Sequence, residues 1–355
     1  MDQALLIRLL EAVTVSGNEE AGQEIALEYG KCFAHAQRTD AVGNAFSVVN
    51  PDAARRVLLC AHMDEIGFRV THICEDGMLR VQKAGGVRAG LYVGSPMQVV
   101  HECVEDGRAV RRRVCGVGVV TDELLKKGDV ADGDLFIDIG AANRAEAAAV
   151  VSVGDSACAD TRVRELLNRR VTARALDDKA GAFVILEAAR LAAGRGASCG
   201  IVVNTCAGEE TTGRGAYFAG AQTRPDCAVV VDVTWASDCP GGDPGSNGEV
   251  RLGGGPVLCH SGMVDKRMNR RLAQIAAEKG ISLQYEVAAG RTYTDGDTLL
   301  KTGPGVPVAL VSIPLRYMHS SVEIASLDDL QACIELIAEF LLRMDGGFDD
   351  PAPMP

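Results

Sequence analysis

A histidine and a carboxylate stand close together in the segment AHMDEIG, a combination that suits divalent metal chemistry. His62 and Asp64 are two residues apart, so on an extended chain their side chains point the same way. Imidazole is a common metal ligand, and a neighbouring carboxylate can accept its second N–H and fix the tautomer. The pattern is short, and an ordinary surface loop would also explain it.

Paired acids occur in two further segments. Asp177 and Asp178 stand in LDDKAG directly before a predicted helix, while Glu209 and Glu210 in AGEETTG follow a predicted buried strand. Adjacent acids disfavour one another's ionisation, and a helix N-terminus would relieve part of that cost. A dinuclear metal site would relieve it differently, because one carboxylate can bridge two cations. In such a site one glutamate binds a metal while its neighbour accepts a proton from water.

Two further candidates accompany predicted strands. Asp232 lies inside the apolar run AVVVDV, where an unpaired aspartate would be costly, and His319 follows the apolar run VALVSI. A single histidine is more often structural than a ligand. Together, however, the segments place two histidines and several acids at strand ends, where open α/β sheets bind ligands. This donor set suits zinc, cobalt or manganese.

The elements that would position these side chains follow an α/β pattern with one interruption. Apolar runs predict buried strands at 57–61, 200–205, 227–233 and 307–313, and periodic segments predict helices at 2–13, 181–193, 265–279 and 326–344. Short Val-rich segments alternate with Gly turns from 70 to 160, which is typical of a small β barrel or sandwich. We therefore expect an α/β domain from 1–68 and 165–348, a β-rich insertion at 69–164, and a disordered tail at 349–355.

Two helix starts carry capping predictions. In the segment SGNEE, Ser16 is expected to cap a second helix that runs towards Cys32. Ser326 followed by Asp329 predicts a start that resembles a capping box for the last helix.

Composition limits the partners and the location. The chain has 355 residues, which favours two domains, and its net charge of −12 argues against nucleic acid or an anionic membrane as a partner. The chain shows no signal-peptide pattern at its N-terminus and no apolar run long enough to span a bilayer. The 12 cysteines have no CxxC spacing, and Cys60, Cys199 and Cys206 lie in apolar runs. Free buried thiols and a cytoplasmic location are therefore expected.

The motifs AHMDEIG, LDDKAG, AGEETTGRGA, VVDVT and RYMHSSVE resemble, in order and spacing, those of the tetrahedral (TET-type) glutamyl or deblocking aminopeptidases. The likeness covers nearly the whole chain. It implies two divalent ions, one held by His62, Asp177 and Asp232 and the other by Asp177, Glu210 and His319. It also implies that Glu209 is the general base and that Asp64 is the partner of His62.

The same resemblance implies a zinc-peptidase-like α/β fold. Its mixed sheet is flanked by helices and carries an inserted small β-barrel-like domain. Family members act on peptides and assemble as homo-oligomers, from dimers to hollow dodecamers. This sequence departs from the pattern at Lys179, where relatives commonly have arginine, and this puts local packing or substrate anchoring in doubt. Relatives often have a cis link between the paired acids, here Asp177 and Asp178, which the sequence leaves open.

We therefore predict a cytoplasmic aminopeptidase in which two ions, zinc above others, activate a water that cleaves the first peptide bond. A deacylase of N-acyl amino acids on the same site is the main alternative. A binding protein without activity and a glycosidase are weaker ones, since a glycosidase needs only a carboxylate pair. The loops 253–261 and 289–296 are expected to line the substrate pocket. Within them Arg291 is interpreted as a solvated surface residue, although it could favour acidic side chains.

Overall fold

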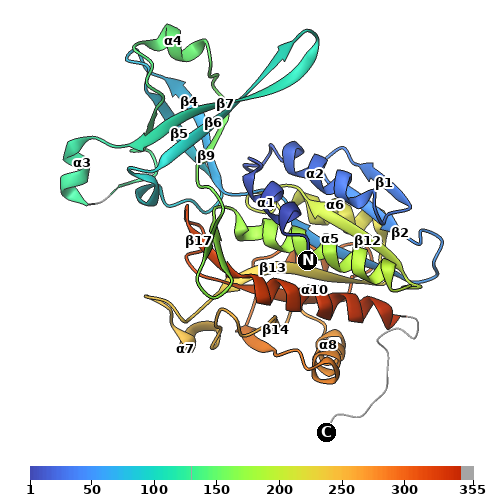
Figure 1. The fold of residues 1–355 in the computed structure, drawn as a ribbon. Helices are drawn as coiled ribbons and strands as arrows, with labels where there is room; N and C mark the ends of the chain where they lie inside the picture. The colour runs from blue at the N-terminus through green and yellow to red at the C-terminus, as the bar shows by residue number, and fades with distance from the viewer. Residues whose placement is uncertain (129, 345–355) are drawn as a thin grey trace.

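An eight-stranded mixed sheet forms the centre of the larger part of the molecule (Figure 1). The computed structural model describes residues 1–128 and 130–344, so the tail expected at 349–355 lies outside the described residues. The strands follow one another across the sheet in the order β1 (Ala36–Thr39), β2 (Ala45–Val49), β12 (Gly200–Cys206), β3 (Arg56–His62), β13 (Cys227–Trp235), β16 (Val308–Leu315), β14 (Val257–Ser261) and β15 (Gln284–Ala288). Strands β12, β3, β13 and β16 are parallel neighbours. The predicted apolar runs thus form the middle of the sheet.

Helices cover both faces of this sheet. One face packs against α1 (Gln3–Glu11), α2 (Glu20–Gly30), α5 (Leu176–Gly194), α8 (Lys266–Lys279) and α10 (Leu327–Leu342). The other face packs against α6 (Arg214–Thr223) and α9 (Gly296–Leu299), and the short helix α7 (Pro244–Asn247) contacts β15. Alternate residues of β3 serve the two cores, with Leu59 on the first face and Leu58 on the second. Burial on both faces explains why these strands are continuous apolar runs rather than alternating ones.

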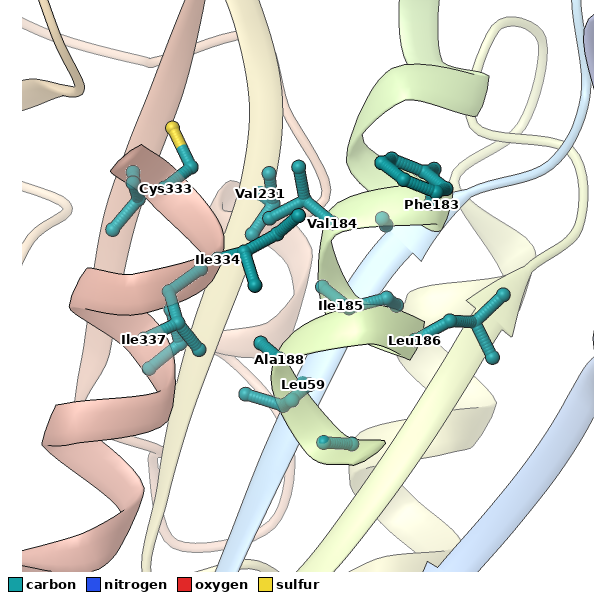
Figure 2. Packing of buried hydrophobic residues seen from close by; sticks show 14 of the residues in the cluster. Leu59, Phe183, Val184, Ile185, Leu186, Ala188, Val231, Cys333, Ile334 and Ile337 are labelled. Atoms are coloured by element: carbon teal, nitrogen blue, oxygen red, sulfur yellow. The ribbon is translucent and has the colours of Figure 1, made fainter. Parts of the chain in front are cut away.

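The larger core is built around α5 (Figure 2). Ala188 of this helix lies next to Leu59 of β3, Val184 lies next to Val231 of β13, and α10 packs alongside. All are almost completely buried. This packing fixes the start of α5 relative to the ends of the central strands, which is where the candidate site lies.

A closed six-stranded barrel projects from the sheet domain, at the upper left of Figure 1. Its strands, in order around the barrel, are β4 (Gly67–Ile73), β5 (Leu79–Ala84), β8 (Phe136–Asp138), β7 (Arg108–Val119), β6 (Pro96–Glu105) and β9 (Ser156–Ala159). Short helices α3 (Asp122–Lys127) and α4 (Arg144–Ala148) and a 3-10 turn, η1 (Ala89–Tyr92), complete it. The structure also has a small three-stranded sheet, formed by β10 (Arg164–Leu166), β11 (Arg170–Ala173) and β17 (Glu323–Ser326). The predicted fold class, a mixed α/β sheet with a barrel, is confirmed.

The helix caps differ from the sequence predictions. Helix α2 has no side-chain cap, and the Oγ of Ser16 instead lies 2.8 Å from the Oγ1 of Thr211. Ser326 does cap α10, but Asp329 does not complete a capping box. Its two oxygens accept hydrogen bonds of 2.7 and 2.8 Å from main-chain N–H groups of the loop before β14. In both places a contact with a distant segment replaces the local one.

None of the twelve cysteines, all of which lie among the described residues, forms a disulfide, and Cys60, Cys199 and Cys206 are buried, as predicted. Among the described residues no helix is both long enough and apolar enough to cross a membrane.

Candidate metal centre

The six side chains that the sequence singles out as ligands or base meet at the carboxyl ends of the central parallel strands. The residues come from β3, the start of α5, the turn after β12, strand β13 and the loop after β16, and they are His62, Asp177, Glu209, Glu210, Asp232 and His319. Parallel strands end at the same edge of the sheet, so side chains distant in sequence lie together there. All six line one cavity.

Asp177 lies between the two histidines. Its Oδ1 is 3.2 Å from the Nε2 of His62, and its Oδ2 is 3.1 Å from the Nε2 of His319. Glu210 places Oε1 3.5 Å from the same atom of His319, and Asp232 places Oδ1 4.0 Å from the Nε2 of His62. Each oxygen of Asp177 therefore faces a different histidine, and each histidine has one further carboxylate beside it. The Asp177–Asp178 peptide bond is cis.

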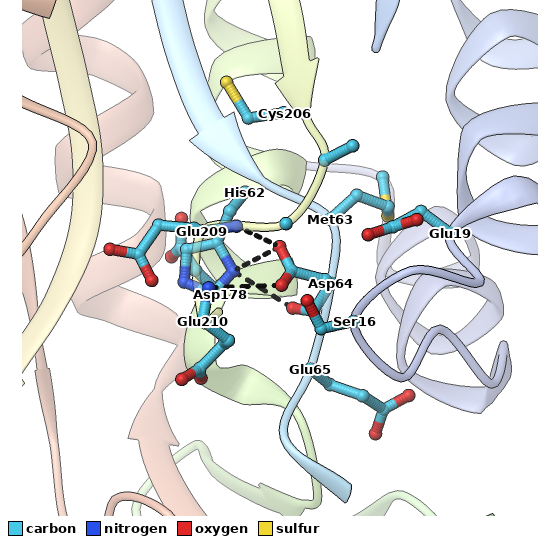
Figure 3. Close-up of polar contacts among 12 residues, drawn as sticks. Ser16, Glu19, His62, Met63, Asp64, Glu65, Asp178, Cys206, Glu209 and Glu210 are labelled. Atoms are coloured by element: carbon cyan, nitrogen blue, oxygen red, sulfur yellow. Dashed lines mark hydrogen bonds and ion pairs between the residues drawn. The ribbon is translucent and has the colours of Figure 1, made fainter. Parts of the chain in front are cut away.

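Asp64 holds the turn that carries the paired glutamates (Figure 3). Its Oδ1 accepts a hydrogen bond of 3.0 Å from the main-chain N–H of Glu209, and its Oδ2 accepts one of 3.2 Å from that of Glu210. The Nδ1 of His62 lies 3.0 Å from the main-chain oxygen of Asp64 and 3.5 Å from Oδ1. The imidazole thus contacts both the main-chain oxygen and the carboxylate of Asp64, in keeping with the expected pairing of these two residues. The same carboxylate also holds the glutamate turn.

Negative charge is concentrated at this site. Burial, together with the nearby acids Asp295, Asp232 and Glu210, raises the pKa of Glu209 to about 10 against the opposing effect of His62. Burial likewise raises the pKa of Asp232 well above its usual value. Burial lowers the pKa of His62, but its hydrogen bonds to acids outweigh this and raise the pKa well above normal. Two imidazoles are too little positive charge for so many carboxylates, and divalent cations would supply the balance.

The residues present fit such cations. Two sets of side chains that include His62 place their ligand atoms within 4.8 Å of one another, His62 with Asp177 and Glu210, and His62 with Asp178 and Asp232. The Oδ2 of Asp178 is buried and has no hydrogen-bond partner among the described residues. The second set contains Asp178, where the expected set contained Asp177. Imidazole and carboxylate ligands of this kind suit zinc and other first-row divalent ions.

Two residues that the sequence interpretation did not select also shape the site. Glu323 accepts hydrogen bonds of 2.9 Å from the main-chain N–H of His319 and of 3.2 Å from that of Asp177, so it fixes both. Its position in the motif RYMHSSVE was the only sequence signal. Gly86, between β5 and β6, lies against the imidazole of His319, since a Cβ there would be 2.5 Å from Nδ1. The barrel therefore contributes a wall of the site.

Lys179, the departure from the family pattern, is buried behind the site. Its Nζ donates to the Oε1 of Glu65 at 2.9 Å and to the main-chain oxygen of Ala12 at 2.6 Å. Arg174 pairs with the other oxygen of Glu65. Of the two roles considered, the contacts show local packing, because the ammonium group is held inside this buried cluster.

A cavity of about 660 Å³ opens beside the candidate ligands. The loop 289–296 lines it as predicted, whereas from the loop 253–261 only Cys259 does so. Arg291 lies on the wall with its side chain 64% exposed, and its Nε is 3.1 Å from the Oδ2 of Asp297. Arg291 is thus exposed to solvent, as interpreted from the sequence, and it also lines the cavity wall and has an ion-pair partner.

Residues 43–336 match the M42 glutamyl aminopeptidase family. The chain belongs to this family. It is 31% identical to the lysyl aminopeptidase of Pyrococcus furiosus over 96% of this chain and 97% of the relative. A TET aminopeptidase of a marine-sediment Thaumarchaeota archaeon has a similar structure, with a TM-score of 0.88 at 29% identity, over 97% of this chain and 96% of that one. The TET1 peptidase of Pyrococcus horikoshii gives a TM-score of 0.82 at 28% identity, over 96% and 99%.

As an M42 peptidase the protein is an aminopeptidase, an enzyme that hydrolyses peptide bonds. This favours the peptidase over the deacylase, glycosidase and binding-protein alternatives. The family depends on metal ions, and the groups described above are candidates for binding them.

Proposed function

We propose that the protein releases N-terminal amino acids from peptides at a site that binds two divalent ions, zinc ahead of cobalt or manganese. His62, Asp177 and Asp232 would hold one ion, and Asp177, Glu210 and His319 the other. The observation that carries this proposal is the position of Asp177, whose two oxygens lie 3.2 and 3.1 Å from two different histidines. A carboxylate so placed is suited to bridging two cations.

When bound, the ions would lower the pKa of a water molecule and polarise the scissile carbonyl. Glu209 is then the general base, because it lines the same cavity and its carboxylate forms none of the histidine contacts that engage Glu210. It accepts a proton from the attacking water and delivers it to the leaving amine. Asp64 keeps this base in place through the main-chain N–H of Glu209. A site carboxylate that receives the substrate α-amine would restrict cleavage to the first residue.

The two adjacent glutamates provide a matched test. Glu209→Gln should keep the fold and the full metal content but lose nearly all turnover of aminoacyl amides, because only the base is removed. Glu210→Gln carries the same change of charge one residue away and should lose metal as well. Metal content by mass spectrometry and turnover of fluorogenic amides separate the two outcomes. Persistent activity in Glu209→Gln would refute the assigned base.

Metal titration of the metal-free protein addresses the identity of the ion. We expect zinc to bind most tightly among zinc, cobalt and manganese, because the donor set combines imidazole with carboxylate. A higher affinity for manganese would contradict the choice of zinc.

We also propose that the chain forms homo-oligomers, in which the barrel at 69–164 serves assembly and controls peptide access. The support is its structural likeness to the TET1 peptidase, which can assemble into a tetrahedron or an octahedral shell. Exposed apolar side chains on the barrel, such as Val104 at 75% exposure, fit an assembly role. Light scattering should give a mass above that of one chain. The twelve cysteines, none of which forms a disulfide among the described residues, support a cytoplasmic location, which fractionation would test.

A further inference from the structure

A buried carboxylate lies in the cavity wall away from the candidate metal ligands. Glu286 belongs to β15, at the edge of the sheet, and is only 8% exposed. It lines the same cavity as His62 and Asp232. The catalytic proposal gives it no role, and burying a carboxylate is costly unless its charge is compensated.

The partners of Glu286 are hydroxyl groups. Its Oε1 accepts a hydrogen bond of 2.7 Å from the Oγ of Ser312, and its Oε2 accepts one from the Oγ1 of Thr234. Within the described part of the chain, no lysine, arginine or histidine forms an ion pair with it. Burial raises the pKa of this carboxyl, and the two hydroxyl donors oppose that shift. The hydroxyls orient the carboxylate but do not neutralise it.

The carboxylate of Glu286 lies about one side-chain length from the candidate metal ligands. Thr234, which donates to Glu286, stands two residues after Asp232 on β13, a separation of roughly 7 Å along a strand. Ser312, the other donor, is the cross-strand partner of Asp232 on β16. A substrate whose reacting bond lies at the metal ligands would therefore place the end of a long first side chain near Glu286.

We infer that Glu286 selects peptides whose N-terminal residue carries a cationic side chain, lysine or arginine. The inference rests on the proposed function, since it assumes that the scissile bond lies at the metal ligands. A lysine carries its ammonium group on a four-carbon stem, which matches the separation above. Binding would give the buried carboxylate the cation that it lacks, and an acidic first residue would be repelled.

Arg291, the basic residue on the cavity wall, does not reverse this preference. Its charge is already paired with Asp297, and most of its side chain is exposed to solvent. Its guanidinium also lies over the ring of Tyr293, 5.3 Å from the centroid. The attraction of an exposed and paired arginine for an acidic side chain is weak. The attraction of a buried carboxylate without an ion-pair partner for a basic side chain is stronger.

The test compares substrates that share a side-chain stem and differ at the charged group. Fluorogenic amides of lysine and norleucine share the stem and differ at the ammonium, as arginine and citrulline differ at the guanidinium. The metal-loaded wild-type enzyme should show a kcat/KM at least about tenfold higher for the charged member of each pair, because a hydrogen bond to a charged group is formed only there. Glutamate amide should be a poor substrate.

Glu286→Gln keeps the shape and should bring both ratios close to one. Glu278→Gln on α8 removes the same charge from the surface and should keep the wild-type ratios. Ratios near one in the wild type, ratios unchanged in Glu286→Gln, or a preference for glutamate would overturn the inference. Because the wild-type ratios alone can refute the inference, it can be tested even if Glu286→Gln folds poorly. If the wild type cleaves no amide at all, the proposed function itself fails.

Discussion

Replacing Asp64 by asparagine (Asp64→Asn) removes one of the two carboxylate oxygens that hold the glutamate turn. In the native structure these oxygens accept the main-chain N–H groups of Glu209 and Glu210 at 3.0 and 3.2 Å. Burial raises the pKa of Asp64, but His62 outweighs this and lowers it, so the group is ionised at neutral pH. An asparagine fits the same space but presents an NH₂ group to one of the two N–H donors.

The size of the effect follows from these contacts. One hydrogen bond to a charged acceptor is lost, which costs roughly 1.5–3 kcal/mol, and the remaining bond becomes a neutral one. If this free energy is lost from the stabilisation of the transition state, kcat/KM drops roughly 10- to 150-fold. Loss of groups that orient metal ligands has a comparable effect, roughly 10- to 100-fold in metal affinity.

Steady-state kinetics at saturating metal, with circular dichroism to check the fold, would measure the change. Asp52→Asn, in an exposed turn, carries the same substitution and should behave as wild type. If Asp64→Asn retained wild-type kcat/KM and metal affinity, the carboxylate would not be positioning the turn, and the reasoning would be refuted.

Gly86→Ala should lower metal affinity roughly 10- to 100-fold, because its Cβ would displace the imidazole of His319. Competition with a chelator measures the affinity. Gly90→Ala is the control, because a Cβ at that position would have no neighbouring atom closer than 3.8 Å. An unchanged affinity would contradict the contact. A second prediction concerns acid stability: burial raises the pKa of Glu65, but Arg174 and Lys179 outweigh it and lower the pKa to about 2, from 4.5. Because the pKa of Glu65 is lower in the folded state than in the unfolded state, its ionised carboxylate stabilises the fold fully above about pH 4.5. This stabilisation is lost as the pH falls towards 2. In urea unfolding, Glu65→Gln should therefore lower the free energy of unfolding by roughly 3 kcal/mol at pH 7 and by less at low pH. A difference between variant and wild type that did not change with pH would count against the ion cluster.

The sequence sufficed to predict the central strands and the edge of the sheet that carries the site. Strands such as β3 are buried on both faces, so each is a continuous apolar run that ends at a polar residue, as at His62. Because parallel strands end together, residues after different runs could be expected to meet. The assignment of each ligand to one of the two ions came from the motif resemblance, and the metal experiments above test it.

Features that depend on contacts between distant segments could not be predicted. Asp329 has the spacing of a capping-box acid but binds the loop before β14, since the tertiary contact replaced the local one. Gly86 gives no sign in the sequence that it lies against a histidine more than two hundred residues away. Glu286 is likewise an unremarkable strand residue until Thr234 and Ser312 are placed beside it.

The central claim is that Asp177 lies between two bound cations, and anomalous X-ray diffraction from crystals of the zinc-loaded protein tests it most directly. We predict two anomalous peaks for each chain, one beside His62 and Asp232 and the other beside His319 and Glu210, with Asp177 contacting both. A single peak, or peaks away from Asp177, would contradict the account.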